Sequence, residues 1–238
     1  FDDQVSNVQP LVFLFVSVIA FVMLLIAIRS VFLALKGVLM TVLSVEGVTG
    51  EEQAIAATVT GALTKVGVPA SAIRFDEVDK KIPVPTQTGN LIVELPGTRP
   101  GPRLLFSSHL DTVLLCRGAK PVRKGDRVVN ENSTSALGGD ARSGCAVLIT
   151  LAETLIKHAL PHPPITLLFT VREESGLHGA RELDPKDLGG AAMCFNVDST
   201  HAAKRWTCMT PRPLNDPTSV PGGRDNTHCS GTNSMDPA

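Results

Sequence analysis

The sequence contains no paired cysteine motif, no cluster of basic residues and no internal repeat. The five cysteines are an odd number and none belongs to a Cys-x-x-Cys pair, so we expect reduced thiols and no disulfide framework. The 22 basic and 23 acidic residues give a net charge of −1, and the basic residues are spread along the chain. A nucleic-acid-binding surface needs a basic patch, so we expect no nucleic-acid partner.

Charge is also scarce at the amino-terminal end, where residues 11–28 form an apolar run of 18 residues. This length just reaches that of a membrane-spanning helix, which needs about 20 residues. Arg29 and Lys36 follow the run, and positive residues favour the cytoplasmic side, so the rest of the chain is expected inside the cell. The run lacks the basic leading region and the cleavage site of a secretory signal.

Three interpretations of residues 1–32 stay open at this point. The segment is a membrane-spanning helix that tethers the chain, a buried core helix, or a non-native edge of the sequence. The apolar run sits at the threshold length, so length does not decide between the first two.

From residue 33 to residue 201, strand and helix patterns alternate. Apolar residues at helical spacing predict helices over 31–47 and 51–67, the second with Thr49 as its cap, and a longer helix after the glycine turn at 138–139. A loop is expected between 112 and 137. Short apolar runs bounded by Gly and Pro predict strands over 72–78, 89–97, 103–111, 163–176 and 191–199. This alternation indicates an α/β domain with a largely buried sheet.

The composition changes after residue 201. Residues 202–238 contain five prolines and three glycines in 37 positions and have no periodicity. Few apolar side chains are available there to offset the entropy of ordering the chain. We therefore expect a disordered tail, which is not necessarily native sequence.

Acidic side chains and one histidine stand at the ends of the predicted strands and at the glycine turn. Such ends converge on one edge of a parallel-type sheet, and several carboxylates gathered there repel one another unless cations neutralise them. One histidine with several carboxylates suits zinc or a comparable divalent ion better than calcium. The candidate residues are His109, Asp111, Asp140, Glu173, Glu174 and Asp198.

Three segments carry a resemblance to a known family. They read SSHLDTV (107–113), ALGGDARSG (136–144) and TVREESGLHGA (170–180). They resemble the signature segments of the dinuclear zinc peptidases that include peptidase T, aminoacylase and carboxypeptidase G, with peptidase T-like members the most similar. The resemblance extends over about residues 35–201. It implies a zinc-exopeptidase-like mixed sheet flanked by helices, and a hydrolase that uses two zinc ions to cleave short peptides.

The resemblance also implies roles for the first metal site. The histidine of the His-x-Asp pair binds one metal, which matches His109, and its aspartate orients that imidazole, which matches Asp111. The aspartate after the glycine turn bridges both metals, which matches Asp140, and a later carboxylate, Asp198, completes the first metal's ligands. The family pattern further implies a cis peptide bond after Asp140.

The glutamate pair has two separate roles by the same resemblance. Glu173 corresponds to the general base that takes a proton from water and returns it to the leaving amine. Glu174 corresponds to a ligand of the second metal. Adjacent residues point to opposite faces of an ideal strand, which lets the two side chains do different work.

The resemblance stops near Asp198, before the inserted lid or dimerisation domain and before the last histidine ligand of the second metal. We therefore expect residues 33–201 to be the amino-terminal part of a catalytic domain that retains about one zinc ion. Family members often dimerise through the part that does not appear here. The expected function is that of a cytoplasmic peptidase T-like aminopeptidase. The alternatives are an N-acyl amino acid amidohydrolase or carboxypeptidase of the same family, and an inactive membrane-tethered fragment.

Overall fold

The computed structural model describes residues 2–125, 127–198 and 212–213, and the chain divides into two units, residues 1–37 and 38–238. The division falls between Gly37 and Val38, whereas the sequence places the domain boundary at residues 32 and 33. Each unit is described by itself below.

Helix α1 (Asp2–Leu43) is one continuous helix that joins the predicted apolar run to the predicted helix after it. Its part from Phe13 to Leu43 is long and apolar enough to cross a membrane, and none of its most apolar window is buried. Most large apolar side chains between Phe13 and Leu33 are exposed, so this part of the helix is not a core helix among the described residues. A helix that is apolar all round finds a favourable environment in lipid or in a protein core.

The helix predicted over 31–47 ends earlier than expected, at Leu43 instead of Gly47. The residues after Leu43 leave the helix because they pair with another segment: Thr112 N donates to Gly47 O at 3.0 Å, and Thr49 N donates to Thr112 O at 2.9 Å. These two bonds flank a parallel bridge between Val48 and Thr112.

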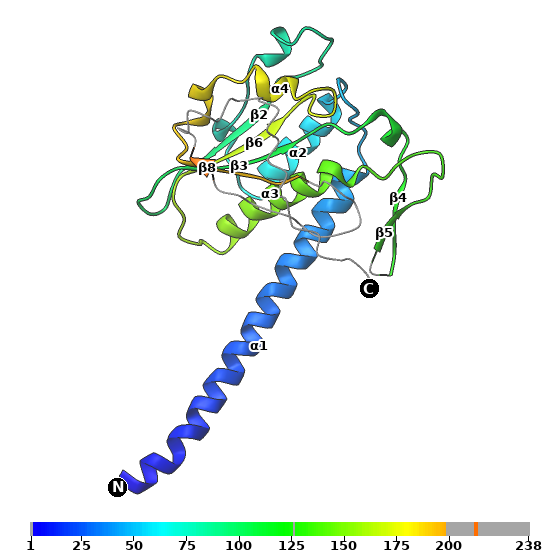
Figure 1. The fold of residues 1–238 in the computed structure, drawn as a ribbon. Coiled ribbons are helices and arrows are strands. Elements are labelled where there is room, and N and C mark those ends of the chain that lie inside the picture. Colours follow the sequence, from blue (N-terminus) through cyan, green and yellow to red (C-terminus); the bar gives the residue numbers. More distant parts are fainter. Residues whose placement is uncertain (1, 126, 199–211, 214–238) are drawn as a thin grey trace, which may run out of the picture. The chain divides into compact units, whose positions relative to one another are not determined.

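A mixed six-stranded sheet forms the centre of the second unit (Figure 1). Strand β3 is parallel to β6 and β7, and the remaining pairs are antiparallel. Every residue of β6 is buried, which explains why this central strand is apolar without alternation. The strands, in sheet order, are β1 (Ile73–Phe75), β2 (Leu91–Leu95), β6 (Ile165–Thr170), β3 (Leu104–His109), β7 (Met193–Asn196) and β8 (Arg212–Pro213). The predicted mixed sheet flanked by helices is confirmed.

Helices cover the sheet through apolar faces. Helix α3 (Gly139–Lys157) packs on β3, and α2 (Gln53–Lys65) packs beside α3 with Ile55, Val59 and Leu63 buried. A second apolar cluster joins Ile92, Leu105 and Leu168 of the sheet to Leu188 and Ala191. Short helices complete the unit: α4 (His178–Arg181) and the 3-10 turns Ala70–Ala72, Val78–Lys80, Leu114–Cys116 and Pro185–Leu188.

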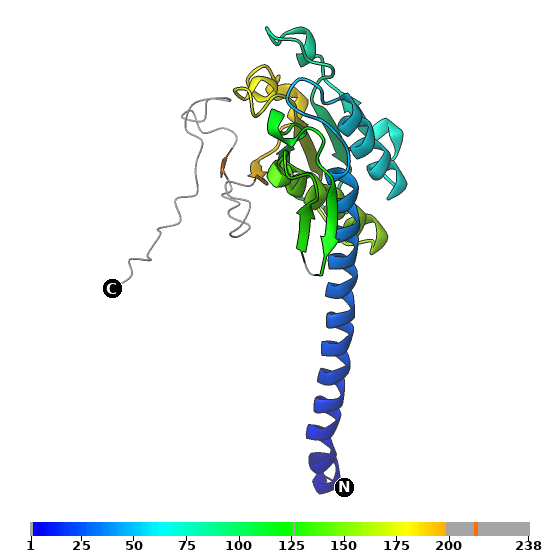
Figure 2. The ribbon, with the colours of Figure 1, turned by 90° about the vertical axis from the view of Figure 1, so that its right-hand side faces the viewer.

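The hairpin of β4 and β5 was not predicted. Strands β4 (Pro121–Lys124) and β5 (Arg127–Asn130) pair as a separate antiparallel hairpin inside the segment expected to be a loop (Figure 2). Its strands are four residues long and mostly charged or half-buried, so they lack the apolar alternation that predicts a strand.

Of the predicted tail, only Arg212 and Pro213 are described, and they pair with β7 as an edge strand. The rest of the disorder prediction, residues 202–211 and 214–238, lies outside the described residues.

Candidate metal centre

The site lies where two neighbouring parallel strands end together. His109 is the last residue of β3 and pairs with Thr170, the last residue of β6. Leu110 N then donates to Thr170 O at 2.8 Å, so the chain after β3 stays beside the chain after β6. The two polar strand ends therefore lie at one edge of the sheet, as the sequence analysis predicts.

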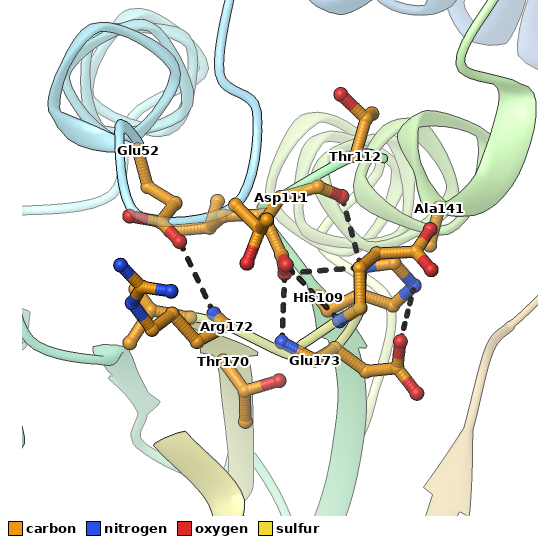
Figure 3. A network of polar contacts seen from close by, with 12 residues as sticks. Glu52, His109, Asp111, Thr112, Ala141, Thr170, Arg172 and Glu173 are labelled. Atoms are coloured by element: carbon orange, nitrogen blue, oxygen red, sulfur yellow. Dashed lines mark hydrogen bonds and ion pairs between the residues drawn. The ribbon is translucent and has the colours of Figure 1, made fainter. Parts of the chain in front are cut away.

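His109 is buried and contacts carboxylates through both ring nitrogens (Figure 3). Its Nδ1 lies 3.3 Å from Asp111 Oδ1 and 3.0 Å from the Asp111 carbonyl oxygen. Its Nε2 faces the opposite way, 3.2 Å from Asp140 Oδ1, 3.5 Å from Asp198 Oδ1 and 3.9 Å from Glu173 Oε2. One nitrogen is thus held by Asp111, and the other points into a group of three carboxylates.

Asp140 reaches this group from the start of α3. Gly138 has a φ of +75°, a conformation that suits glycine, and it begins the turn. The Asp140–Ala141 peptide bond is cis, as the family resemblance implies. Gly144 allows α3 to approach β3, because a Cβ there would collide with Ser108 and with the Val197 carbonyl.

Glu173 and Glu174 follow β6 and are anchored by their backbone. Glu173 N donates to Asp111 Oδ1 at 3.0 Å and Glu174 N donates to Asp111 Oδ2 at 3.1 Å. Asp111, which is fully buried, therefore holds both the histidine of one strand end and the glutamate pair of the other.

Three of these residues form a group that fits a metal ion. The ligand atoms of His109, Asp140 and Glu174 all lie within 4.8 Å of one another. A nitrogen and two carboxylate oxygens suit a divalent ion of the zinc type, and further carboxylates lie at the same edge. All six predicted site residues therefore meet in one place.

The buried imidazole carries an unusual charge balance. Burial alone lowers the pKa of His109, but its hydrogen bonds to Asp111, Asp140 and Asp198 raise that pKa well above its ordinary value. Burial raises the pKa of Asp111, yet the bonds from His109 and from the two glutamate amides overcome this and lower it.

The other carboxylates shift in the opposite direction. Burial, together with nearby negative charge, raises the pKa of Asp140 and of Glu173, and it raises the pKa of Glu174 to about 7. Carboxylates placed this closely repel one another, and a divalent cation among them relieves that repulsion. The electrostatics and the ligand geometry agree that these residues fit a metal.

The sequence analysis did not identify three buried residues that lie beside the site. Glu52 and Asn90 are fully buried and accept backbone bonds after β6, while the buried guanidinium of Arg142 donates to Leu110 O at 2.6 Å. Glu52 follows Glu51 at a helix start, so nothing distinguishes it from an ordinary first-turn acid.

The prediction that Thr49 caps α2 is wrong. Glu52 stands at the cap position of that helix, and the side chain of Thr49 donates instead to Ser175 Oγ.

Comparisons with known proteins find similarity to peptidases, in agreement with a metal-fitting site. The family model described as Peptidase family M28 matches residues 90–220. The uncharacterized protein YqjE of Bacillus subtilis is 40% identical over 111 residues, which cover 47% of this chain and 29% of that protein. The crystal structure of aminopeptidase PepT from Bacillus cereus has 32% identity and a TM-score of 0.63, covering 70% of this chain and 43% of that one.

A relative of a different kind also matches. The heme uptake protein MmpL11 of Mycobacterium tuberculosis is 72% identical over 50 residues, which cover 21% of this chain and 5% of that protein. The chain thus spans less than half the length of each relative and structure named here. The similarity to the aminopeptidase PepT structure confirms the resemblance to peptidase T-like enzymes.

Proposed function

The chain belongs to peptidase family M28, and from its site we propose that it is part of a metal-dependent hydrolase that cleaves short peptides. One observation carries this proposal: His109, Asp140 and Glu174 form a metal-fitting group, and Glu173 lies at the edge of the same group. The ligands that hold a metal and a carboxylate free to move a proton are thereby combined at one sheet edge.

We assign the ligands in two sets. His109, Asp140 and Asp198 would hold a first ion, and Asp140 and Glu174 would contribute to a second, so the group of His109, Asp140 and Glu174 would contain ligands of both ions. Their nitrogen and oxygen donors favour zinc. Among the described residues the first set is the fuller one, so the full chain is expected to retain about one zinc ion tightly.

The chemistry of peptide hydrolysis can be written from these residues. A divalent ion bound here supplies Lewis-acid chemistry, which polarises the scissile carbonyl and acidifies water. Glu173 accepts a proton from the attacking water as the new C–O bond forms, and it delivers that proton to the amine as the C–N bond breaks. Asp111 keeps His109 in one tautomer and orientation throughout.

The substrate we propose is the amino-terminal end of a short peptide. The similarity to aminopeptidase PepT and to peptidase T-like signature segments supports this assignment. An N-acyl amino acid amidohydrolase or a carboxypeptidase uses the same chemistry and is the alternative. Dimerisation, which the family resemblance implies, is part of the same proposal.

We further propose that α1 tethers the domain to the cytoplasmic face of a membrane. Its exposed apolar part is long enough to span the bilayer, and Arg29 and Lys36 favour the cytoplasm. Recovery of the full chain in the soluble fraction without detergent would refute the tether.

The experiment that tests the function uses the full chain purified in detergent. Its metal content is measured after dialysis, and its hydrolysis of a tripeptide is compared with that of an N-acetylated amino acid. We expect about one zinc per chain and slow cleavage that favours the tripeptide. Preference for the acetylated substrate would support the alternative. Absence of bound metal together with absence of hydrolysis would refute the metallohydrolase and favour an inactive tethered fragment.

A further inference from the structure

The chain after β6 is held in an unusual way, because four consecutive backbone N–H groups all donate to side chains. None of the acceptors is exposed to solvent. The acceptors are Asn90 Oδ1 for Val171 N (3.0 Å), Glu52 Oε1 for Arg172 N (3.2 Å), Asp111 Oδ1 for Glu173 N (3.0 Å) and Asp111 Oδ2 for Glu174 N (3.1 Å). Buried backbone donors need partners, and here three side chains replace the sheet partners that ended with Thr170.

Arg172 has a backbone conformation in this segment that few residues with a side chain adopt. Its φ is +51°, in the left-handed region that a side chain disfavours. Such a conformation persists only where the surroundings hold it. The amide of Arg172 is held by Glu52, and the guanidinium is held by Thr86 Oγ1 at 2.9 Å and by the Pro85 carbonyl. Glu173 and Glu174 follow immediately, so this conformation sets where their side chains begin.

Burying the carboxyl group of Glu52 costs free energy, and bonds within α2 do not offset that cost. Its Oε1 also accepts from Gly50 N at 2.7 Å, and its Oε2 is buried with no hydrogen-bond partner among the described residues. Although Glu52 stands at the cap position of α2, its side chain makes no capping bond to that helix. A carboxyl group that only filled space here would cost stability that an apolar side chain would not. Figure 3 shows Glu52 reaching from the start of α2 to the backbone of Arg172.

We propose that Glu52 is a positioning residue for the Glu173–Glu174 pair. It acts through the Arg172 amide, as Asp111 acts through the next two amides, and it couples the start of α2 to the metal centre. This inference rests on the proposed function, since it assigns Glu174 to a metal and Glu173 to the proton transfer.

The test measures metal binding, not turnover. Cobalt(II) is titrated into the metal-free full chain in detergent, and the visible absorption of bound cobalt reports ligand number and geometry. Glu52→Met keeps the length of the side chain and removes the acceptor, and we expect it to weaken cobalt binding about tenfold or more and to change the spectrum. Glu52→Gln restores an acceptor oxygen, and we expect an affinity within about twofold of the unmodified chain and an unchanged spectrum.

Two control variants separate positioning from stability and charge. Val59→Ala removes buried volume from the same helix, and Glu51→Gln removes the neighbouring exposed carboxylate, which pairs with Arg117. We expect both to bind cobalt as the unmodified chain does. If Glu52→Met does not fold, Glu52→Asp decides, since its shorter side chain draws the oxygen away from Arg172 N and should weaken binding similarly.

The outcomes distinguish the two proposals. Unchanged cobalt affinity and spectrum in Glu52→Met, or in Glu52→Asp where that variant decides, would overturn the positioning role alone. An equal loss in Val59→Ala would also overturn it, because general destabilisation would then explain the effect. Failure of the unmodified chain to bind cobalt would overturn the metal centre itself, and the positioning role with it.

Discussion

Strands β3 and β6 lie side by side and end at the same level, yet the two ends are built differently. The β3 end supplies a proposed metal ligand together with its own support, because Asp111 holds the imidazole of His109 two residues away. Both side chains are almost fully buried, with exposed fractions of 3% and 0%. The β6 end supplies the two glutamates proposed for metal binding and proton transfer but no support of its own, and the side chain of Glu173 is 24% exposed.

This difference shows how one site can hold a buried, fixed histidine beside partly exposed carboxylates. The buried end uses short contacts within three residues of chain, so its geometry follows from the local sequence. The half-exposed end depends on Asp111, Glu52 and Asn90, which come from three other places in the fold. Partial exposure is compatible with the proton transfer proposed for Glu173, while the buried acceptors hold its backbone.

The largest expected effect comes from the chemical side of the β6 end. Glu173→Gln removes the proposed proton acceptor and leaves the backbone bond to Asp111 intact. We expect the tripeptide turnover of the metal-loaded chain to fall about 10²–10⁴-fold while its retained metal stays unchanged. Steady-state kinetics and metal analysis on the same preparation check this. Glu131→Gln, at an exposed position, is the charge-matched control. Loss of metal in Glu173→Gln would instead make Glu173 a ligand.

The next largest effect comes from removing the support that both ends share. Asp111→Ala removes the carboxylate beside His109 Nδ1 and deprives Glu173 N and Glu174 N of their acceptor, while the carbonyl oxygen of residue 111 remains beside Nδ1. We expect metal affinity to fall about 10–100-fold, together with a lower melting temperature, because orienting partners typically contribute that much to metal binding. Isothermal titration with zinc measures the affinity, and Glu131→Ala is its control. An affinity equal to that of the unmodified chain would show that the two ends position themselves independently.

The arrangement at the end of β3 can be predicted from the sequence better than the arrangement at the end of β6. His109 and Asp111 are two residues apart on a strand, so the spacing itself carries their proximity. Asp140, Glu173, Glu174 and Asp198 are found only through family signature segments and the convergence of strand ends. Glu52 and Asn90 lie 120 and 81 residues from the amides they hold, and no local pattern encodes such contacts. The β4–β5 hairpin and the helix end at Leu43 were missed for a related reason, since pairing partners override local propensity.

A smaller effect concerns the pH dependence of the metal-free chain. The pKa of His109 is raised, so its contribution to stability is present below its ordinary pKa and is lost as pH rises through the raised value. The raised pKa values of Glu173 and Glu174, the latter about 7, act in the same direction, because ionisation restores repulsion in the fold.

We therefore expect the melting temperature in EDTA to fall as the pH rises from about 4.5 to about 7 through the glutamates, and to go on falling above the ordinary histidine pKa of about 6.5 through His109. Added zinc should reverse this slope, since metal binding displaces protons from its ligands. Thermal melts at matched ionic strength measure both curves. A metal-free curve that is flat or rises over this range would contradict the charge balance deduced for the β3 and β6 ends.

The smallest expected effect separates the cost of burying Glu52 from its positioning role. Burial raises the pKa of this carboxyl, so the folded chain favours the protonated form, and ionisation costs stability as pH rises above the ordinary value. Glu52→Gln cannot ionise and is free of that cost. Its melting temperature relative to the unmodified chain should therefore become more favourable from pH 4 to pH 8, by about 2–4 °C for each ~1 kcal/mol relieved. Glu51→Gln, whose parent carboxylate has a pKa lowered by its hydrogen bond to Arg117, should show the opposite trend or none. A pH-independent difference for Glu52→Gln would mean that Glu52 is ionised at no cost. The β6 end would then be supported by a full charge at Glu52, as it already is at Asp111.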